Sequence, residues 1–252
     1  MVKTKNTKGT HEVLSFNPKE VVRALLTALP TRAQDVVKQR FGLGKSPDRA
    51  TLEAIGQTYG ITRERVRQIE NFALKALRKS PSYQVAESAF DELEEAVLSY
   101  GGIVNEQKFL DHLSKDKNVQ NILHFLLVLG DRFEKLKEDE EFHHRWTVDK
   151  KLSEKVHGAI RKLCSSVSDE DLIKEEQLIA QFLKEIKDIV RDANNPELAR
   201  RWLDLSKQLS RNPLGEWGKA SSPNIKLRGM RDYAYLVLRS NGKPMHFVEV
   251  TE

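Results

Sequence analysis

The chain has 252 residues, of which 39% are hydrophobic and 31% charged, and its formal net charge is +5. This length predicts two or three domains, and the composition is typical of a soluble, helix-rich protein with small cores. No apolar run approaches the roughly 20 residues that span a bilayer, and the amino terminus lacks the apolar stretch of a signal peptide. We therefore expect a cytoplasmic protein that has no membrane partner. Cys164 is the only cysteine, which excludes an intrachain disulfide and a cysteine-rich zinc site.

Charge is distributed unevenly along the chain. Residues 1–81 carry a net charge of +9, residues 82–150 carry −7, and residues 151–252 carry +3. A polyanion would therefore dock on the amino-terminal third. Residues 1–16 are polar and basic without any period, and they predict a flexible basic arm.

Residues 17–50 predict two helices. Asn17 followed by Pro18 is a helix-start signal, because Asn caps the first turn and Pro fits its first position. Pro30 and Thr31 end this helix and start a second one, with Thr31 as its cap. The second helix continues to Gly42, a residue typical of helix ends. A loop rich in Gly, Ser and Pro follows over residues 43–50.

Residues 51–79 carry the strongest pattern in the sequence. Thr51 caps a short helix that Gly60 ends, and a longer helix follows from Arg63 to about Lys79. Two helices joined by a short turn that contains Gly form the helix-turn-helix arrangement. We therefore predict a helix-turn-helix DNA-binding domain over residues 17–81.

The longer helix has two chemically different faces. Its predicted buried stripe recurs at spacings of three and four residues, at Val66, Ile69, Ala73 and Leu77. The opposite face offers side chains that suit base edges, since Arg can bind guanine, Gln adenine, and a carboxylate the cytosine amine. These candidate base-reading residues are Arg63, Glu64, Arg67 and Gln68. Arg65, Lys75 and Arg78 are candidates for phosphate contacts. The alternative interpretation is a solvated helix face.

The segments LPTRAQDVVKQRFGL and TLEAIGQTYGITRERVRQIENFALKALRKS resemble region 4 of the sigma-70 family of bacterial RNA polymerase sigma factors, over about residues 18–80. The resemblance implies that Arg63, Glu64 and Gln68 read bases of the minus-thirty-five promoter hexamer. It also implies a set of contacts to the DNA backbone, made by Arg32, Arg40, Thr51, Leu52, Arg65 and Arg67. By the same resemblance, the apolar surface of the first two helices would grip the flap of the polymerase β subunit.

The sequence departs from the family pattern in three respects. Ala54 stands where a second Glu is usual, and Phe72 stands where a basic residue is common, so sequence preference and phosphate contacts are expected to differ. Only about seventeen residues precede the matching segment, whereas a complete sigma factor carries an aromatic-rich strand-capturing module there. We therefore expect that this chain does not melt promoters by itself.

Residues 82–150 predict a winged-helix-like domain. One helix is expected over residues 82–100, ended by two glycines, followed by helices over 106–113 and 119–129. The segments FEKLK and FHHRWTV then alternate like the strands of a hairpin. The tip between them carries four carboxylates, Glu138 to Glu141, which would be repelled by phosphate. We therefore favour a protein-contacting role for this domain, with a DNA-contacting wing as the alternative.

Residues 151–222 predict a second, diverged winged-helix-like domain. Helices are expected over residues 152–164, 176–191 and 196–209, followed by a short segment at 214–217 as a reduced wing. Residues 223–252 are expected to form a helical tail. Its sequence, IKLRGMRDYAYLVLRSNGKPMHFVEVTE, resembles the opening of the HARE-HTH winged-helix domain, known from the polymerase delta subunit and from chromatin and restriction proteins. Such a domain is longer, so we expect either truncation at Glu252 or docking of this segment on its neighbour.

Other patterns favour ordinary structural roles. Gly44-Lys45-Ser46 ends like a phosphate-binding loop, but Gln39 stands where that motif needs Gly. His143 and His144 are adjacent on a presumed strand and point to opposite faces, so they make a poor metal pair. Acidic clusters occur without a compact catalytic constellation, and Trp202 and Trp217 are interpreted as core residues. We therefore expect no enzyme activity, no metal and no cofactor.

The sequence as a whole predicts a mainly α protein, with a helix-turn-helix head followed by tandem winged-helix-like domains that carry short β-hairpin wings. The leading hypothesis is sequence-specific binding of duplex promoter DNA, with docking on the RNA polymerase core and a further protein partner bound through residues 82–222. One alternative is a protein-interaction adaptor or anti-sigma-type regulator. Another is the DNA-targeting part of a restriction or repair enzyme.

Overall fold

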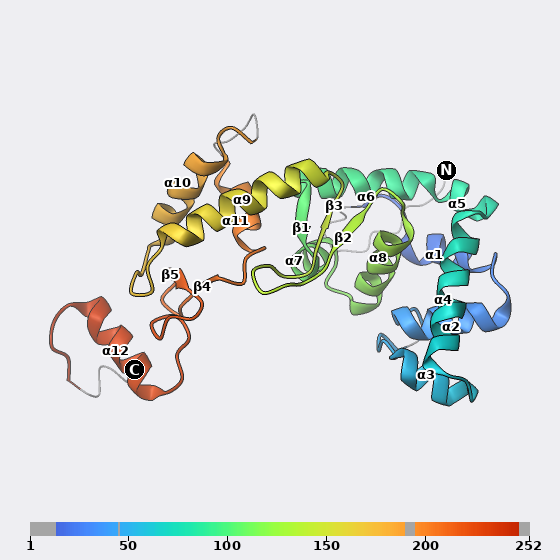
Figure 1. Ribbon diagram of the computed structural model, residues 1–252, viewed down its shortest axis with the longest axis horizontal. Coiled ribbons are helices and arrows are strands. Elements are labelled where there is room, and N and C mark those ends of the chain that lie inside the picture. Colours follow the sequence, from blue (N-terminus) through green and yellow to red (C-terminus); the bar gives the residue numbers. More distant parts are fainter. Residues whose placement is uncertain (1–13, 45, 190–194, 247–252) are drawn as a thin grey trace, which may run out of the picture. The chain divides into compact units, whose positions relative to one another are not determined.

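A computed structural model describes residues 14–44, 46–189 and 195–246 (Figure 1). The fold is mainly helical with short strands, as the sequence predicts. The chain divides into two compact units, which are described separately. Unit 1 comprises residues 1–102, 106–135 and 146–148, and unit 2 comprises residues 103–105, 136–145 and 149–252. Most of the predicted basic arm lies outside the described residues.

The head, residues 17–81, contains four helices of unit 1. They are α1 (Pro18–Leu26), α2 (Thr31–Phe41), α3 (Leu52–Tyr59) and α4 (Arg63–Arg78). The predicted caps of α1 and α3 are confirmed, because Asn17 Oδ1 accepts a hydrogen bond from Lys19 N and Thr51 Oγ1 accepts one from Ala54 N. The expected capping role of Thr31 is wrong. Thr31 is already the first helical residue, and Pro30 before it makes no side-chain cap.

The helix predicted over residues 82–100 is instead two helices, α5 (Pro81–Val85) and α6 (Glu87–Tyr100). The break lies at Ala86, whose backbone has φ −82° and ψ 0°. Because the break reorients α5, Val85 does not join the buried stripe of α6 and is 78% exposed. The predicted stop is confirmed, since Gly101 and Gly102 follow α6 at φ 136° and 74°, a range that favours glycine.

The elements that follow α6 come in winged-helix order. They are β1 (Ile103–Asn105), α7 (Glu106–Leu113), α8 (Lys117–Leu129), β2 (Glu134–Leu136) and β3 (Arg145–Thr147). The strands form one sheet in the order β1-β3-β2, and the division between the units passes through these strands. The two predicted strands of the wing are present, whereas β1 was not predicted.

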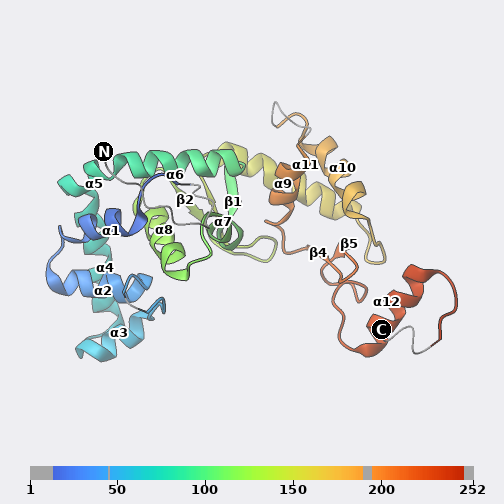
Figure 2. The ribbon, with the colours of Figure 1, turned by 180° about the vertical axis from the view of Figure 1, so that it is seen from behind.

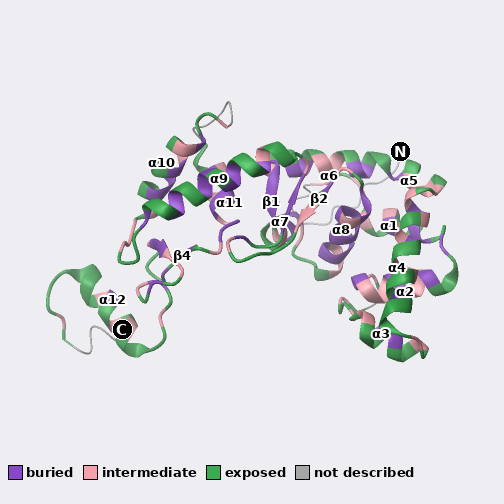
Figure 3. Ribbon diagram, viewed as in Figure 1, coloured by how far each residue is buried: buried purple, intermediate pink, exposed green. Residues whose placement is uncertain are grey.

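Helix α8 is the central packing element of unit 1. Nearly all of its residues from Gln120 to Leu129 are buried (Figure 3). It lies beside α1 in both views (Figure 2). The rings of Phe41, at the end of α2, and Phe125 of α8 meet edge to face at 5.0 Å. The head therefore packs on α8 through its own apolar side chains.

Unit 2 is built from α9 (Lys150–Ser166), α10 (Glu175–Ile186), α11 (Pro196–Leu203) and α12 (Met230–Asn241), with strands β4 (Leu209–Arg211) and β5 (Trp217–Lys219). The strands pair antiparallel with Ser210 opposite Gly218. The helix expected to reach Leu209 is wrong at its end, because α11 stops at Leu203. Ser206 forms a β-bridge with Phe142 instead, and Leu209 begins β4.

The winged-helix order recurs in unit 2. Between α9 and α10, Ile173 forms an antiparallel bridge with Trp217 of β5, through backbone hydrogen bonds of 2.7 and 2.8 Å. Ile173 thus occupies the place that β1 has in the first sheet, where β1 also lies beside the strand that comes last in the chain. Trp202 and Trp217 are buried, which confirms them as core residues. Among the described residues, no helix is both long and apolar enough to cross a membrane.

Candidate nucleic-acid interface

The turn between α3 and α4 is fixed by close backbone packing. A Cβ atom added to Gly56 would lie 2.6 Å from the carbonyl oxygen of Ile61, so only glycine lets α3 approach the turn this closely. Gly60 ends α3 in the left-handed region at φ 63°. Thr62 then caps α4, because its Oγ1 accepts a hydrogen bond from Arg65 N at 3.2 Å. These contacts fix the orientation of α4 relative to α3.

Helix α4 buries the stripe that the sequence predicts. Val66, Ala73 and Leu77 are fully buried, and Ile69 is half-buried. The small core beneath the turn brings Val66 together with Val36 of α2 and Ile55 of α3. The predicted base-reading residues Arg63, Glu64, Arg67 and Gln68 are all exposed. The opposite face of a well-anchored helix is therefore open to solvent.

The exposed polar groups of α4 bind one another. Arg67 donates from Nε and Nη2 to the two carboxylate oxygens of Glu64, at 2.8 and 2.7 Å. Arg65 Nη1 donates to Gln68 Oε1 at 3.0 Å. The hydrogen bond from Arg67 lowers the pKa of Glu64 and raises the pKa of Arg67 itself. Both groups therefore remain charged near neutral pH, as an interaction with DNA would require.

Several candidate phosphate-binding residues lie around α3. Arg40 Nη1 donates to the carbonyl oxygen of Ala50 at 3.2 Å, which brings the guanidinium next to Thr51 at the start of α3. It also lies 3.5 Å from a carboxylate oxygen of Glu70. The guanidinium of Arg32 lies over the ring of Tyr59, 5.5 Å from its centroid. The structure thus gathers Arg32, Arg40, Thr51 and Leu52 on α2 and α3.

The two remaining candidates near the end of α4 differ in their surroundings. Lys75 is exposed on the same face as Gln68. Arg78 instead donates to the carbonyl oxygens of Val128 and Leu129, at 3.0 and 2.9 Å, and forms an ion pair with Asp131 at 2.8 Å. Its guanidinium is occupied by the end of α8. Arg78 is therefore left out of the interface proposed below.

The anchoring of the head to α8 was not foreseen from the sequence. Asn121 is completely buried, and its Nδ2 donates to the carbonyl oxygens of Gly42 and Pro47 at 3.2 and 2.7 Å. Its Oδ1 accepts a hydrogen bond from Arg49 Nε at 2.8 Å. The available signal was an Asn directly before the apolar run of α8, because a buried amide needs polar partners.

A buried polar cluster lies next to this anchor. One carboxylate oxygen of Glu106 accepts hydrogen bonds from Lys135 Nζ and Trp146 Nε1, both at 2.7 Å. Burial by itself would raise the pKa of Glu106, but Lys135 and its other polar neighbours together lower it. His124 is also buried there, and burial lowers its pKa to about 3. The carboxylate is thus charged and the imidazole neutral near neutral pH.

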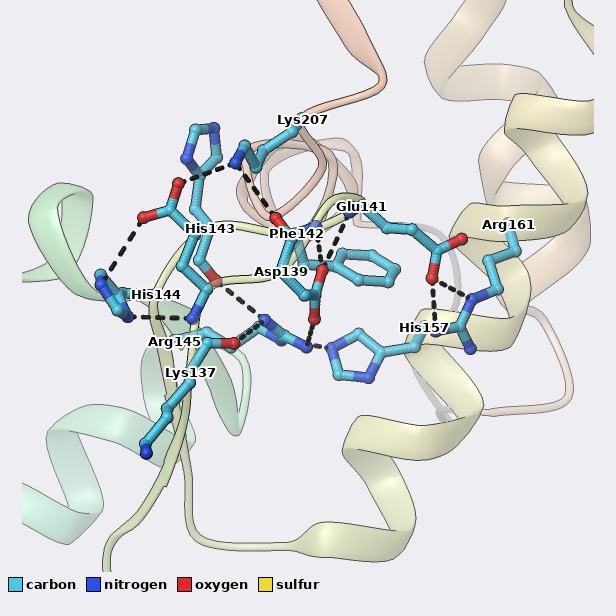
Figure 4. Close-up of polar contacts among 11 residues, drawn as sticks. Lys137, Asp139, Glu141, Phe142, His143, His144, Arg145, His157, Arg161 and Lys207 are labelled. Carbon is cyan, nitrogen blue, oxygen red and sulfur yellow. Dashed lines mark hydrogen bonds and ion pairs between the residues drawn. The ribbon is translucent and has the colours of Figure 1, made fainter.

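In unit 2, the predicted acidic wing tip is paired with cations (Figure 4). Arg145 is buried and donates to the carbonyl oxygens of Lys137 and His143, each at 2.9 Å, and to Asp139 Oδ2 at 2.9 Å. Two more ion pairs surround the tip, Lys207 with Glu138 at 2.8 Å and Arg161 with Glu141 at 2.7 Å. The carboxylates are therefore largely neutralised by their own unit.

His157 completes the contacts of Arg145. Its Nε2 accepts a hydrogen bond from Arg145 Nε at 2.9 Å, which requires that nitrogen to be unprotonated. Burial, and then the charge of Arg145, lower the pKa of His157 to about 4. No group of three or more His, Cys, Asp or Glu side chains within the described segments is arranged to hold a metal ion.

Comparison with known proteins identifies the head. Residues 25–79 match the family model of sigma-70, region 4. The RNA polymerase sigma factors RpoD of Helicobacter pylori strains ATCC 700392 / 26695 and J99 / ATCC 700824 are each 46% identical to this chain over 65 residues. That match covers 26% of this chain and 10% and 9% of the two relatives, so the chain spans about a tenth of their length. No solved structure gives a significant match.

Proposed function

Because residues 25–79 form a sigma-70 region 4 domain, we propose that the chain binds duplex promoter DNA by placing α4 in the major groove. The observation that carries this proposal is the exposed face of α4. There Arg63, Glu64, Arg67 and Gln68 stand opposite the buried residues Val66, Ala73 and Leu77. These are the side-chain types that recognise guanine, cytosine and adenine edges. The proposed target is an element of the minus-thirty-five type.

The phosphate contacts of this proposal surround the reading helix. Arg32, Arg40 and the start of α3 at Thr51 and Leu52 would hold the DNA backbone on one side. Arg65 and Lys75 would hold it from α4 itself. Contacts of this kind position the protein without reading sequence. Binding should weaken steeply with salt, because each phosphate contact releases counterions.

We also propose docking on RNA polymerase, which depends on access to a surface that α8 covers. The family resemblance assigns the grip on the β flap to the apolar surface of α1 and α2. In this chain α8 packs against that surface, with Phe125 against Phe41 and Asn121 bound to Gly42. A flap that binds in the family manner must therefore displace α8. The alternative function as an interaction adaptor is favoured by the same packing, because α8 already supplies the head with a helical partner.

Random-site selection with the full chain tests the DNA proposal. Duplexes recovered after repeated rounds should share a short common sequence, and their affinity should fall linearly on a logarithmic scale of salt concentration. Recovery of unrelated sequences with equal affinity would exclude base reading. A parallel pull-down with RNA polymerase core tests docking separately. Capture that persists when α4 can no longer bind DNA would favour the adaptor.

A further inference from the structure

A groove in unit 1 runs between α1 and the first turns of α8, away from the exposed face of α4. Its volume is about 410 Å³. One wall is a single face of α1, because its lining residues follow the spacing i, i+3, i+4, i+7. These are Lys19, Val22, Arg23 and Leu26. The other wall comes from Asn118 and Ile122, one turn apart on α8, and the end is closed by Lys38 and the loop at 42–44.

The rim of the groove carries positive charge that the described residues leave largely unmatched. Lys19 lies 3.7 Å from Asp116. Among the described side chains, no carboxylate forms an ion pair with Arg23 or Lys38, although both border the groove. Arg40 and Arg78 in the same unit each face a carboxylate. The groove therefore offers at least two cations to an incoming anionic group.

The floor of the groove is aliphatic and contains one unused acceptor. Val22, Leu26 and Ile122 are each less than 8% exposed, and Leu43 is half-buried beside them. Asn118 Oδ1 is buried, and it accepts no hydrogen bond from the residues that the structure describes. Because this oxygen has almost no exposed surface, an incoming segment would contact only the aliphatic floor and the cations of the rim.

We propose that this groove binds an acidic, aliphatic peptide segment of a partner protein. Carboxylates of the segment would face Arg23 and Lys38, and its aliphatic side chains would cover Val22 and Ile122. A duplex DNA backbone offers phosphates but no aliphatic groups for the floor. The groove shares no residue with the proposed base-reading set Arg63, Glu64, Arg67 and Gln68.

Fluorescence anisotropy tests the proposal with the full chain. The probe is a fluorescein-labelled peptide of glutamate and leucine in a helical repeat, and its matched control has glutamine in place of glutamate. We expect the glutamate peptide to bind, and the Arg23→Glu and Lys38→Glu substitutions each to weaken binding about fivefold or more. Lys155→Glu, on the exposed face of α9, is the control and should leave binding unchanged.

Methyl NMR of the full chain locates the bound peptide, and the signals of Val22, Leu26 and Ile122 should shift. Three results would overturn the proposal: no binding, equal binding of the glutamine peptide, or shifts that map elsewhere. A fourth is that a promoter duplex displaces the glutamate peptide, and that Arg23→Glu weakens binding of the duplex as much as it weakens binding of the peptide. The groove would then be a nucleic-acid contact. Random-site selection gives its result independently, so failure of the peptide site leaves the DNA proposal intact.

Discussion

Glu64 and Arg67 hold each other through two hydrogen bonds, at 2.8 and 2.7 Å, on the solvent face of α4. The pair lies in water, where screening makes such an interaction weak. In the proposed complex Glu64 would exchange Arg67 for a base edge, and Arg67 would exchange Glu64 for a base edge or a phosphate. The pair therefore keeps both side chains extended over this face of α4, and breaking it to bind DNA would require little free energy.

Substitutions on α4 should separate base reading from phosphate binding. We expect Arg63→Ala and Gln68→Ala each to relax the preference at one base position, with a loss of about 1 to 3 kcal/mol for the preferred site. Arg65→Ala should weaken all sequences alike and reduce the slope of log affinity against log salt by about one. Random-site selection followed by salt titration measures both. Unchanged base preferences in the Arg63→Ala and Gln68→Ala variants would remove α4 as the reader.

A methyl group at Gly56 should damage the head. The new Cβ would meet the Ile61 carbonyl oxygen at 2.6 Å, so Gly56→Ala is expected to destabilise the α3–α4 packing by about 1 to 3 kcal/mol. Gly158→Ala is the matched control, because Gly158 is also helical but its Cβ would meet nothing within 4 Å. The control should gain up to about 1 kcal/mol from helix propensity. Hydrogen exchange of α3 and α9 distinguishes the two, and equal effects would show that the turn tolerates the methyl group.

Two arginines at the acidic tip should differ widely in importance. The side chain of Arg145 is 7% exposed and holds two carbonyl oxygens, Asp139 and His157. Arg145→Ala removes the donor from buried His157 and from the two carbonyl oxygens, and it should cost about 3 kcal/mol. Arg161 is 53% exposed and pairs with Glu141, so Arg161→Ala should cost about 0 to 1 kcal/mol. Urea unfolding of the full chain, monitored by hydrogen exchange of unit 2, measures the loss of unfolding free energy in each variant. Equal losses in the two variants would contradict the prediction.

Unit 2 should lose stability in mild acid because of His157. Its folded pKa is about 4, below the ordinary value of 6.5. Between these values the unfolded chain binds a proton that the folded chain excludes, so the free energy of unfolding falls as pH drops from 6.5 toward 4. His157→Gln keeps an acceptor for Arg145 without titrating, and it should flatten this dependence. A pH dependence that His157→Gln leaves unchanged would rule out this origin.

Local chemistry explains the parts of the fold that the sequence predicts well. The starts of α1 and α3 follow from Asn17 and Thr51, whose side chains bond to backbone only two or three residues away. The stop at Gly60 follows from its positive φ. The exposed face of α4 follows from helical spacing alone. Each of these signals lies within one helical turn, so no knowledge of distant residues was required.

The features that were missed depend on distant partners or leave no local trace. Arg78 looked like a phosphate ligand because its partners, the carbonyl oxygens near the end of α8, lie some fifty residues away. Strand β1 was not predicted, although β2 and β3 are equally short. Ala86 interrupts a helix although Ala favours helices, so composition gave no warning of that break. The roles of the individual site residues stay predictions.

The burial of α8 determines whether the head can be separated from the rest of unit 1. In a winged helix the third helix is commonly the one that enters a DNA groove. Here the third helix is α8, and its Phe125 and Asn121 pack against the head instead. A head cut free at Ser80 would expose Phe41 to water and leave Arg49 without its amide acceptor. The head is therefore not an independent module, because its packing depends on α8, which begins only at Lys117. A transfer of the head to another protein would have to include α8.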